Sequence, residues 1–203
     1  EKLQINMTLE EIVIAVKGKI KNTGVLKGLF FGLVLNFTIS PYSLANDMPV
    51  GAKVQSGNVK ISGPTQDHMI IDQSSNKSII NWNGFSIHKN GRVDFNMPSS
   101  SSSSLNRVTG STPSTIAGQL NSNGKVLIIN PNGVMITKEG VVKTGSFTAS
   151  TLDIKNEDFL NNKFKFTGNG SSKSVNNKGK IIIGSGGSAA LLGGQISNSG
   201  VVS

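Results

Sequence analysis

The sequence predicts an almost entirely β fold after residue 45, built as a solenoid of stacked coils. From Val50 onward, short runs alternate apolar and polar residues, as strands do, and Gly, Asn and Ser punctuate them. No long stretch with the helical period of about 3.6 residues follows Ala45. A small glycine unit also recurs at intervals near twenty residues, which is typical of a solenoid.

The recurring unit is a glycine followed two positions later by valine or isoleucine. It occurs at Asn90–Val93, Asn123–Val126, Glu139–Val142, Lys178–Ile181 and Ser199–Val202. The step from Gly124 to Gly140 and the step from Gly179 to Gly200 are both close to this repeat length. A unit of this size cannot bury its apolar side alone, so we expect each unit to stack on its neighbours. Asparagines at the turns are expected to bond to the backbone or to the same residue one coil away.

The last unit begins where the sequence stops, at Val201-Val202-Ser203. A bare β edge would remain there, and natural solenoids cap such an edge or continue it. We therefore expect the protein to continue beyond Ser203.

The stretch Asn123–Thr137 shows the local pattern most clearly. Two β-type runs, Val126–Ile129 and Val134–Ile136, flank Asn130-Pro131-Asn132-Gly133. Pro131 presets φ for the first corner of a turn, and Asn132 and Gly133 are the residues that most readily adopt a positive φ after it. The stretch therefore predicts strand, tight turn and strand, with Gly124 closing the preceding turn.

Composition narrows the classes of function. The chain has 20 Lys and Arg against 11 Asp and Glu, a net charge of +9, and no cysteine. The absence of cysteine excludes a disulfide framework, a thiol nucleophile and a cysteine-based metal site. The lysines are scattered singly and are not interleaved with aromatic residues, so the sequence does not predict nucleic-acid binding.

Residues 1–45 have the pattern of a secretory signal peptide with a long basic n-region. Lysines precede Gly28–Ile39, a run that is apolar except for Asn36 and Thr38. The run is too short for a membrane span, which needs about 20 residues. Pro41 ends it, and Ser43 and Ala45 place small residues at the −3 and −1 positions of a cleavage site. We expect cleavage between Ala45 and Asn46, leaving residues 46–203 as the exported domain.

The remaining polar residues do not form a catalytic or metal-binding pattern. Trp82 alternates with Ile80 and is expected in the core. His68 and His88 have no histidine or carboxylate at ligand spacing, so neither a metal nor another cofactor is expected. The serine run Ser99–Ser104 is predicted to be a surface loop.

A β-helix lyase or hydrolase is the enzyme alternative. Such a site needs clustered carboxylates to hold a cation or to act as an acid and base pair. The acidic residues after Ala45 are Asp47, Asp67, Asp72, Asp94, Glu139, Asp153, Glu157 and Asp158. Only Glu157 and Asp158 are adjacent, so we do not expect an enzyme.

Several blocks in this order resemble the N-terminal secretion domain of two-partner secretion exoproteins, also called the haemagglutination activity domain. The matching blocks are Ile80–Trp82, Phe85–Ile87, Val93–Asn96, Leu105–Gly110, Gly118–Leu120, Asn123–Val126, Ile129–Val134, Ala149–Ile154, Asn177–Ile181, Ala189–Gly193 and Ser197–Ser203. The family includes filamentous haemagglutinins, high-molecular-weight adhesins and haemolysins. Leu105–Gly110 stands where the haemagglutinin and haemolysin branch has a second Asn-Pro-Asn motif, and Met97 stands where Gln is common. The chain is thus nearer the high-molecular-weight adhesin type.

The resemblance implies a right-handed parallel β-helix with some antiparallel strands near its N-terminal cap. It also implies that the domain is the export address of a large surface adhesin or secreted passenger of a Gram-negative bacterium. The general secretion machinery would deliver the chain to the periplasm. The periplasmic POTRA domains of a cognate outer-membrane transporter would then recognise it, before the chain folds at the cell surface.

Six residues are the candidate secretion motif, namely Asn106, Arg107, Asn130, Pro131, Asn132 and Gly133. One interpretation is that Asn130–Gly133 is a rigid corner that holds a coil in register, and the other is direct contact with the transporter. Asn106 and Arg107 share this ambiguity, since an arginine among neutral residues often clamps a loop to backbone carbonyls. A separate alternative is that the lysines bind host glycans or heparin, although adhesion is expected mainly from downstream repeats.

Overall fold

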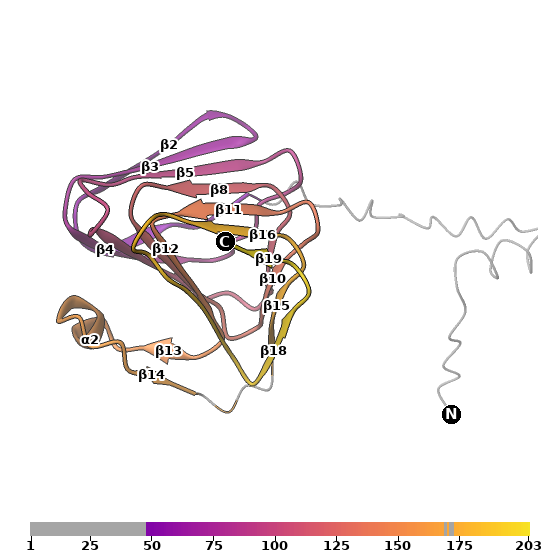
Figure 1. Cartoon of the computed structure of the whole chain (residues 1–203). Helices are drawn as coiled ribbons and strands as arrows, with labels where there is room; N and C mark the ends of the chain where they lie inside the picture. The colour runs from indigo at the N-terminus through magenta and orange to yellow at the C-terminus, as the bar shows by residue number, and fades with distance from the viewer. Residues whose placement is uncertain (1–47, 169, 171–172) are drawn as a thin grey trace, which may run out of the picture. The chain divides into compact units, whose positions relative to one another are not determined.

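The computed structural model describes residues 48–168, 170 and 173–203. The predicted signal peptide and its cleavage site at Ala45 and Asn46 lie outside these residues. The described part is a parallel β-solenoid of about six turns, in which three sheets form three faces (Figure 1). The prediction of an almost all-β parallel helix is therefore confirmed.

From β5 (Arg92–Asn96) to β18 (Gln195–Asn198), successive coils contribute one strand to each face in turn. The seven-stranded sheet contains, in spatial order, β19 (Val201–Val202), β16 (Lys180–Ile183), β11 (Val141–Thr144), β8 (Gln119–Ser122), β5 (Arg92–Asn96), β3 (His68–Gln73) and β2 (Val59–Thr65). The six-stranded sheet contains β1 (Lys53–Ser56), β4 (Lys77–Trp82), β6 (Ser103–Val108), β9 (Lys125–Ile129), β12 (Ser146–Ser150) and β17 (Ala189–Leu192). The four-stranded sheet contains β18 (Gln195–Asn198), β15 (Ser174–Asn177), β10 (Val134–Ile136) and β7 (Ser114–Ile116).

Antiparallel pairing occurs at the N-terminal end of the stack, as predicted. β1 runs antiparallel to β4, and β2 runs antiparallel to β3. The strands of the later coils pair in parallel, in the register Arg92, Gln119, Val141, Lys180, Val201 along the seven-stranded sheet.

One coil is much longer than the others and carries an extrusion. Gln119 pairs with Val141, and Lys180 pairs with Val201, each across one ordinary coil. The step from Val141 to its partner Lys180 is nearly twice as long. The extra length is the segment between β12 and β15, which we name the extrusion (Thr151–Lys173). It contains the antiparallel pair β13 (Asp153–Ile154) and β14 (Phe166–Thr167), and the short helix α2 (Asn156–Leu160), which the sequence analysis did not predict.

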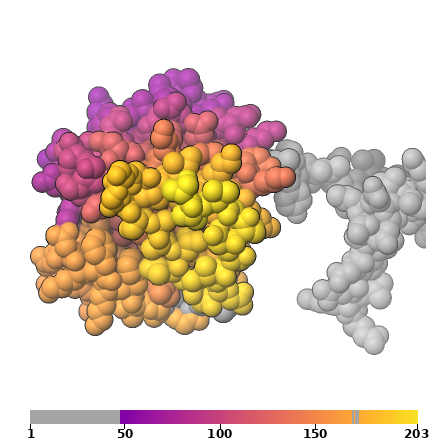
Figure 2. All heavy atoms as spheres, in the orientation of Figure 1, coloured from indigo at the N-terminus to yellow at the C-terminus, as the bar shows by residue number. Residues whose placement is uncertain are grey.

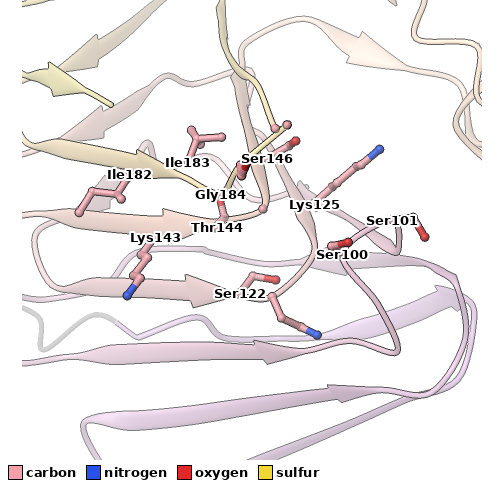
Figure 3. A pocket seen from close by; sticks show the side chains of 15 residues that line it. Ser100, Ser101, Ser122, Lys125, Lys143, Thr144, Ser146, Ile182, Ile183 and Gly184 are labelled. Atoms are coloured by element: carbon pink, nitrogen blue, oxygen red, sulfur yellow. The ribbon is translucent and has the colours of Figure 1, made fainter.

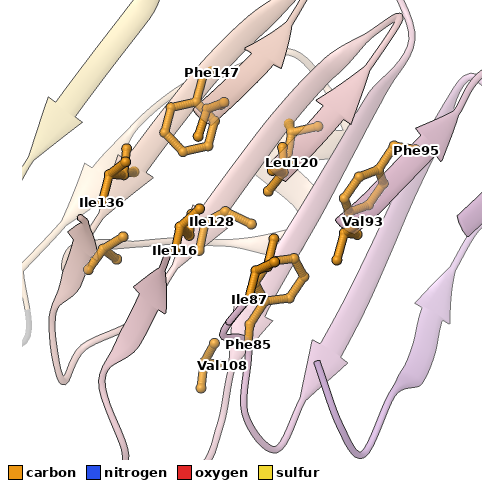
Figure 4. Close-up of a cluster of buried hydrophobic side chains, with 14 of the residues drawn as sticks. Phe85, Ile87, Val93, Phe95, Val108, Ile116, Leu120, Ile128, Ile136 and Phe147 are labelled. Carbon is orange, nitrogen blue, oxygen red and sulfur yellow. The ribbon is translucent and has the colours of Figure 1, made fainter. Parts of the chain in front are cut away.

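The main core fills the interior of the coils with inward-facing side chains from all three sheets (Figure 4). Trp82 is 1% exposed, as expected for a core residue, and its ring meets that of Phe85 edge-on, with centroids 5.3 Å apart. Each fully buried large apolar side chain stabilises the fold by about 1.5–3 kcal/mol. The stacked coils thus share one continuous core, as a solenoid requires.

A ladder of glycines forms the corner where the chain enters the seven-stranded sheet. We call it the glycine corner, and it consists of Gly91, Gly118, Gly140, Gly179 and Gly200. Backbone hydrogen bonds join successive rungs, as when Gln119 N donates to Gly91 O at 2.9 Å. A Cβ on Gly118 would lie only 2.2 Å from Gly91 O, so the rungs are too close for any side chain.

The glycine corner corrects the predicted repeat. Gly124, which the sequence analysis placed in the series, precedes β9 of the six-stranded sheet and belongs to a different corner. Gly118 occupies the rung instead. The spacing between Gly124 and Gly140 is therefore not a coil period, because two corners of the same coil both use glycine.

The serine run is only partly the surface loop that was predicted. Ser103 and Ser104 begin β6, and Ser102, Ser103 and Ser104 are all buried. The Ser104 hydroxyl lies 3.0 Å from that of Ser78 on the preceding coil, and Ser78 in turn donates to Gln73. The Ser102 hydroxyl instead accepts from Ser99 N within the run, and Gln73 of the preceding coil donates to Ser103 O, so the buried run is bonded both locally and between coils.

Candidate functional site

Asn130 lies at the corner between β9 and β10 and is completely buried. Its side-chain Nδ2 donates to Thr112 O and to Ser114 Oγ, both at 2.9 Å. Its Oδ1 accepts from the backbone N–H of Asn132 at 2.9 Å and from Asn132 Nδ2 at 3.2 Å. Both amide protons and both acceptor positions of Asn130 are thus used within the corner.

The rest of the Asn130–Gly133 turn is also built into the stack. Gly133 has a φ of +112°, which favours glycine, and its carbonyl accepts from Ser114 N on the preceding coil at 3.0 Å. Asn132 does not adopt the positive φ that the sequence predicted, and its side chain instead donates to Gly110 O at 2.9 Å. The predicted strands on either side are confirmed as part of β9 and as β10.

Asn106 is a completely buried residue of β6. Its Oδ1 accepts the indole N–H of Trp82 at 3.0 Å, and its Nδ2 lies within 3.4 Å of Ser104 and of Leu127 O. The residue therefore links three successive coils through one amide group.

Arg107, next to Asn106, faces outward and holds the extrusion. Its Nε donates to Asp153 Oδ1 at 2.9 Å, Nη1 to Asn156 Oδ1 at 2.9 Å and Nη2 to Ile154 O at 2.6 Å. The guanidinium thus joins β6 to β13 and to the start of α2. This geometry is that of an arginine clamp on a loop, with a carboxylate added to the carbonyl acceptor.

A second clamp and a second core complete the docking of the extrusion. Lys77 Nζ donates to the carbonyls of Phe159 and Leu160 at 3.1 and 2.6 Å, at the end of α2. Burial, and the charge of Lys125, lower the pKa of Lys77.

Outward-facing residues of the six-stranded sheet pack against three side chains of the extrusion, which are Ile154, Phe159 and Phe166. Figure 2 shows the extrusion, in orange, as a continuous part of the surface beside the yellow C-terminal coils.

The structure brings the two halves of the predicted motif together. Asn106 pairs with Ile128 and Arg107 pairs with Ile129, so both lie beside the strand that leads directly into Asn130. The predicted cleavage residues Ala45 and Asn46 lie outside the described residues. The six motif residues therefore lie on adjacent coils, and among them Arg107 bonds to the extrusion.

Both histidines face aspartates, which their spacing in the sequence did not indicate. His68 Nε2 lies 2.7 Å from Asp94 Oδ2, and His88 Nε2 lies 3.1 Å from Asp67 Oδ1 without hydrogen-bond geometry. Burial would raise the pKa of Asp94, but hydrogen bonds from Arg92, Asn121 and His68, and the charge of Arg92, hold this pKa below its ordinary value.

The model of the TPS secretion domain family matches residues 45–203, which is most of the chain. The chain belongs to this family. As a TPS secretion domain, it is part of a two-partner-secreted exoprotein, a class exported by Gram-negative bacteria. Membership of the family implies, in general, an outer-membrane transporter as the partner.

Solved and curated relatives agree with this assignment. The secretion domain of HMW1 from Haemophilus influenzae matches with a TM-score of 0.72 and 38% identity, over 76% of this chain and 41% of that chain. A heme/hemopexin-binding protein of Haemophilus influenzae strain Rd is 35% identical over 152 residues, which is 74% of this chain. A second heme/hemopexin-binding protein of Haemophilus influenzae is 36% identical over 126 residues, or 62% of this chain. The matches span only 17% and 14% of these two relatives.

Two further properties concern only the residues that the structure describes. Within that part of the TPS domain, no three His, Cys, Asp or Glu side chains are grouped so that they could hold a metal ion. No helix in the same residues has the length and apolar character needed to cross a membrane.

The sequence analysis missed the extrusion and its contacts with Arg107. A signal for it exists, since the interval from Gly140 to Gly179 is nearly two coil periods long. The chemistry of the contact, however, depends on Asp153 and Asn156 lying beside a strand that comes far earlier in the chain.

Proposed function

We propose that residues 46–203 are the export address of this exoprotein, recognised in the periplasm by the POTRA domains of a cognate outer-membrane transporter. The general secretion machinery delivers the chain by means of the signal peptide at residues 1–45, and the β-helix forms at the cell surface. Support comes from membership of the TPS family and from the solenoid architecture, in which coils add one after another as the chain emerges.

The burial of Asn130 indicates when in export the transporter could recognise this segment. In the folded domain every polar atom of its side chain is bonded within the corner, so none is free to bind a transporter. We infer that the transporter binds this segment while the chain is still extended, before the corner at Asn130–Gly133 has folded. An extended, β-prone segment can pair its backbone with the edge of a sheet in the partner. After export, the same residues hold the coil in register.

Two measurements distinguish a structural role of the Asn130–Gly133 turn from direct contact between this turn and the transporter. Asn130→Ala and Gly133→Ala are introduced into the chain, which is co-expressed with the transporter, and the secreted fraction is measured. Both are expected to reduce secretion. Synthetic peptides covering Asn123–Thr137, with and without Asn130→Ala, are titrated against the isolated POTRA domains. Weaker binding of the variant peptide would mean that Asn130 contacts the transporter directly. Equal binding would mean that Asn130 acts only by holding the folded corner in shape.

Asn90→Ala is the matched control, because Asn90 is an exposed asparagine just before a glycine of the glycine corner. It is expected to be secreted like the unmodified chain. Normal secretion of both Asn130→Ala and Gly133→Ala would contradict the proposal. Tighter binding of POTRA domains to the folded domain than to the peptide would contradict recognition of the extended chain.

We also propose that the domain acts without catalysis, since its role is export. The nature of the whole passenger is a separate question. The names of the curated relatives suggest capture of haem or hemopexin, whereas the HMW1 secretion domain is equally similar. Similarity within a shared export domain therefore does not indicate what the passenger binds. A hemin titration of the full-length protein, followed by its absorbance spectrum, would test the haem proposal.

A further inference from the structure

A polar groove runs along the corner where the seven-stranded sheet passes into the six-stranded sheet. It has a volume of about 530 Å³, and we call it the lysine groove. Lys143 of β11 and Lys125 of β9 line it, together with Ser122, Asn123 and Ser146 and the glycine-rich turn at 184–187. Figure 3 shows Lys143 and Lys125 on opposite sides of the groove, with their ammonium groups pointing away from each other and serine hydroxyls nearby.

The charge in this groove is not compensated by acidic residues. No Asp or Glu of the described residues lines it, and neither Lys125 nor Lys143 takes part in the ion pairs found among them. A groove lined by cations without acids attracts an anion and concentrates it locally.

The groove continues onto the outer face of the seven-stranded sheet. A second hollow of about 670 Å³ shares Ser122, Asn123 and Lys143 with it, and extends to Gln119 and Arg92. The acid in this second hollow, Asp94, is already bonded to Arg92, Asn121 and His68. We call the two hollows together the trough, which is lined by amide and hydroxyl side chains as well as by Lys125, Lys143 and Arg92.

We propose that this trough binds a sulfated oligosaccharide. Lysines bind sulfate groups as point charges, and the Asn, Gln and Ser side chains supply the donors and acceptors that sugar hydroxyls require. A nucleic acid fits less well, because Phe95, the aromatic residue among the described residues that line the trough, is only 1% exposed and cannot stack against bases. None of the six motif residues lines the lysine groove, so saccharide binding by the folded domain can be measured apart from export.

The test uses the compact unit Tyr42–Ser203, which has its own core. A heparin-derived octasaccharide, its desulfated counterpart and a single-stranded oligonucleotide of equal charge are titrated by calorimetry at low and high salt. The sulfated octasaccharide is expected to bind at low salt and to weaken as salt rises. The double variant Lys125→Ser/Lys143→Ser should weaken its binding about tenfold or more, which corresponds to about 1.4 kcal/mol.

Lys53→Ser/Lys178→Ser is the matched control, since it removes the same charge from exposed positions outside the groove. It should change affinity less than about threefold. Three results would overturn the proposal: no binding of the sulfated octasaccharide, equal losses in both double variants, or equally tight binding of the desulfated saccharide or the oligonucleotide. The titration uses the purified folded domain and no transporter, so failure here leaves the export proposal to its own test.

Discussion

The indole N–H of Trp82 donates a 3.0 Å hydrogen bond to the side-chain oxygen of Asn106 on the next coil. Both residues are buried, and the Asn106 amide continues to Ser104 and to Leu127 O one coil further. A polar connection inside an apolar core is specific, because a shifted register would leave the indole and the amide without partners. Asn106 is therefore a register residue in the folded domain.

Replacing Asn106 by leucine should destabilise the domain. The change leaves the Trp82 N–H buried without an acceptor, which costs about 1–3 kcal/mol. Urea unfolding followed by the fluorescence of Trp82, the only tryptophan in the chain, measures the free energy of unfolding. Asn90→Leu, at an exposed position, should change this free energy by less than about 0.5 kcal/mol. Equal stability of the Asn106 variant and the unmodified domain would contradict the register role.

Gly118→Ala should be among the most damaging small substitutions. Its Cβ would lie 2.2 Å from Gly91 O and 2.3 Å from His88 O, and both atoms belong to the backbone and cannot rotate away. We expect a loss of about 3 kcal/mol or more in the free energy of unfolding, since the coils must separate locally. Gly63→Ala is the control, because the nearest atoms to its Cβ are 3.6 Å away. Similar stabilities for the two variants would show that the corner can relax.

Arg107→Lys should release the extrusion while leaving the coils intact. A lysine keeps the charge but cannot bond to Asp153, Asn156 and the Ile154 carbonyl together. Amide hydrogen exchange over residues 153–168 is expected to accelerate roughly tenfold to a hundredfold, which corresponds to about 1.4–2.7 kcal/mol of local opening. Exchange in β8 and β11 should not change. Acceleration throughout the chain would instead mean that the extrusion and the coils unfold together.

Asp94 should make the stability of the domain depend on pH on the acid side. Its pKa in the folded state lies below its ordinary value, so its contribution is present above the unfolded pKa of about 4 and is lost as pH falls through the folded pKa. Asp94→Asn is expected to lower the free energy of unfolding at pH 7. At about pH 2 the variant and the unmodified domain should have nearly the same free energy of unfolding. Urea unfolding from pH 7 to pH 2 measures this difference. A difference that stays constant with pH would contradict the role of the carboxylate charge.

Much of the architecture follows from the sequence, because its causes are local. Alternation at Val93 and Phe95 and the turn residues at Asn130–Gly133 predict strands and corners from neighbours in the chain. The assignment of glycines to corners does not follow. Gly118 leads into the seven-stranded sheet and Gly124 into the six-stranded sheet. Which sheet a strand joins depends on its pairing with other coils, and this is a long-range property. The burial of Ser103 and Ser104 has the same origin, since Gln73 and Ser78 of the preceding coil bond to them.

The candidate site shows the same division. The rigid turn at Asn130–Gly133 can be predicted, whereas the acceptors Thr112 and Gly110 that use up its amides cannot, because they belong to the previous coil. The pairing of Arg107 with Asp153 also depends on an extrusion whose fold is not periodic. Periodic sequence predicts the stack, and contacts between coils decide what each polar residue does.

The long coil marks a place where this domain accepts additional chain without losing the pitch of its stack. Val141 and Lys180 pair in the same register as neighbours that are separated by a single ordinary coil, although the extrusion lies between them. A foreign peptide exchanged for part of residues 161–168 would leave the clamps of Lys77 and Arg107 in place. The extrusion is therefore the position at which inserted chain is expected to leave the pairing of the coils unchanged.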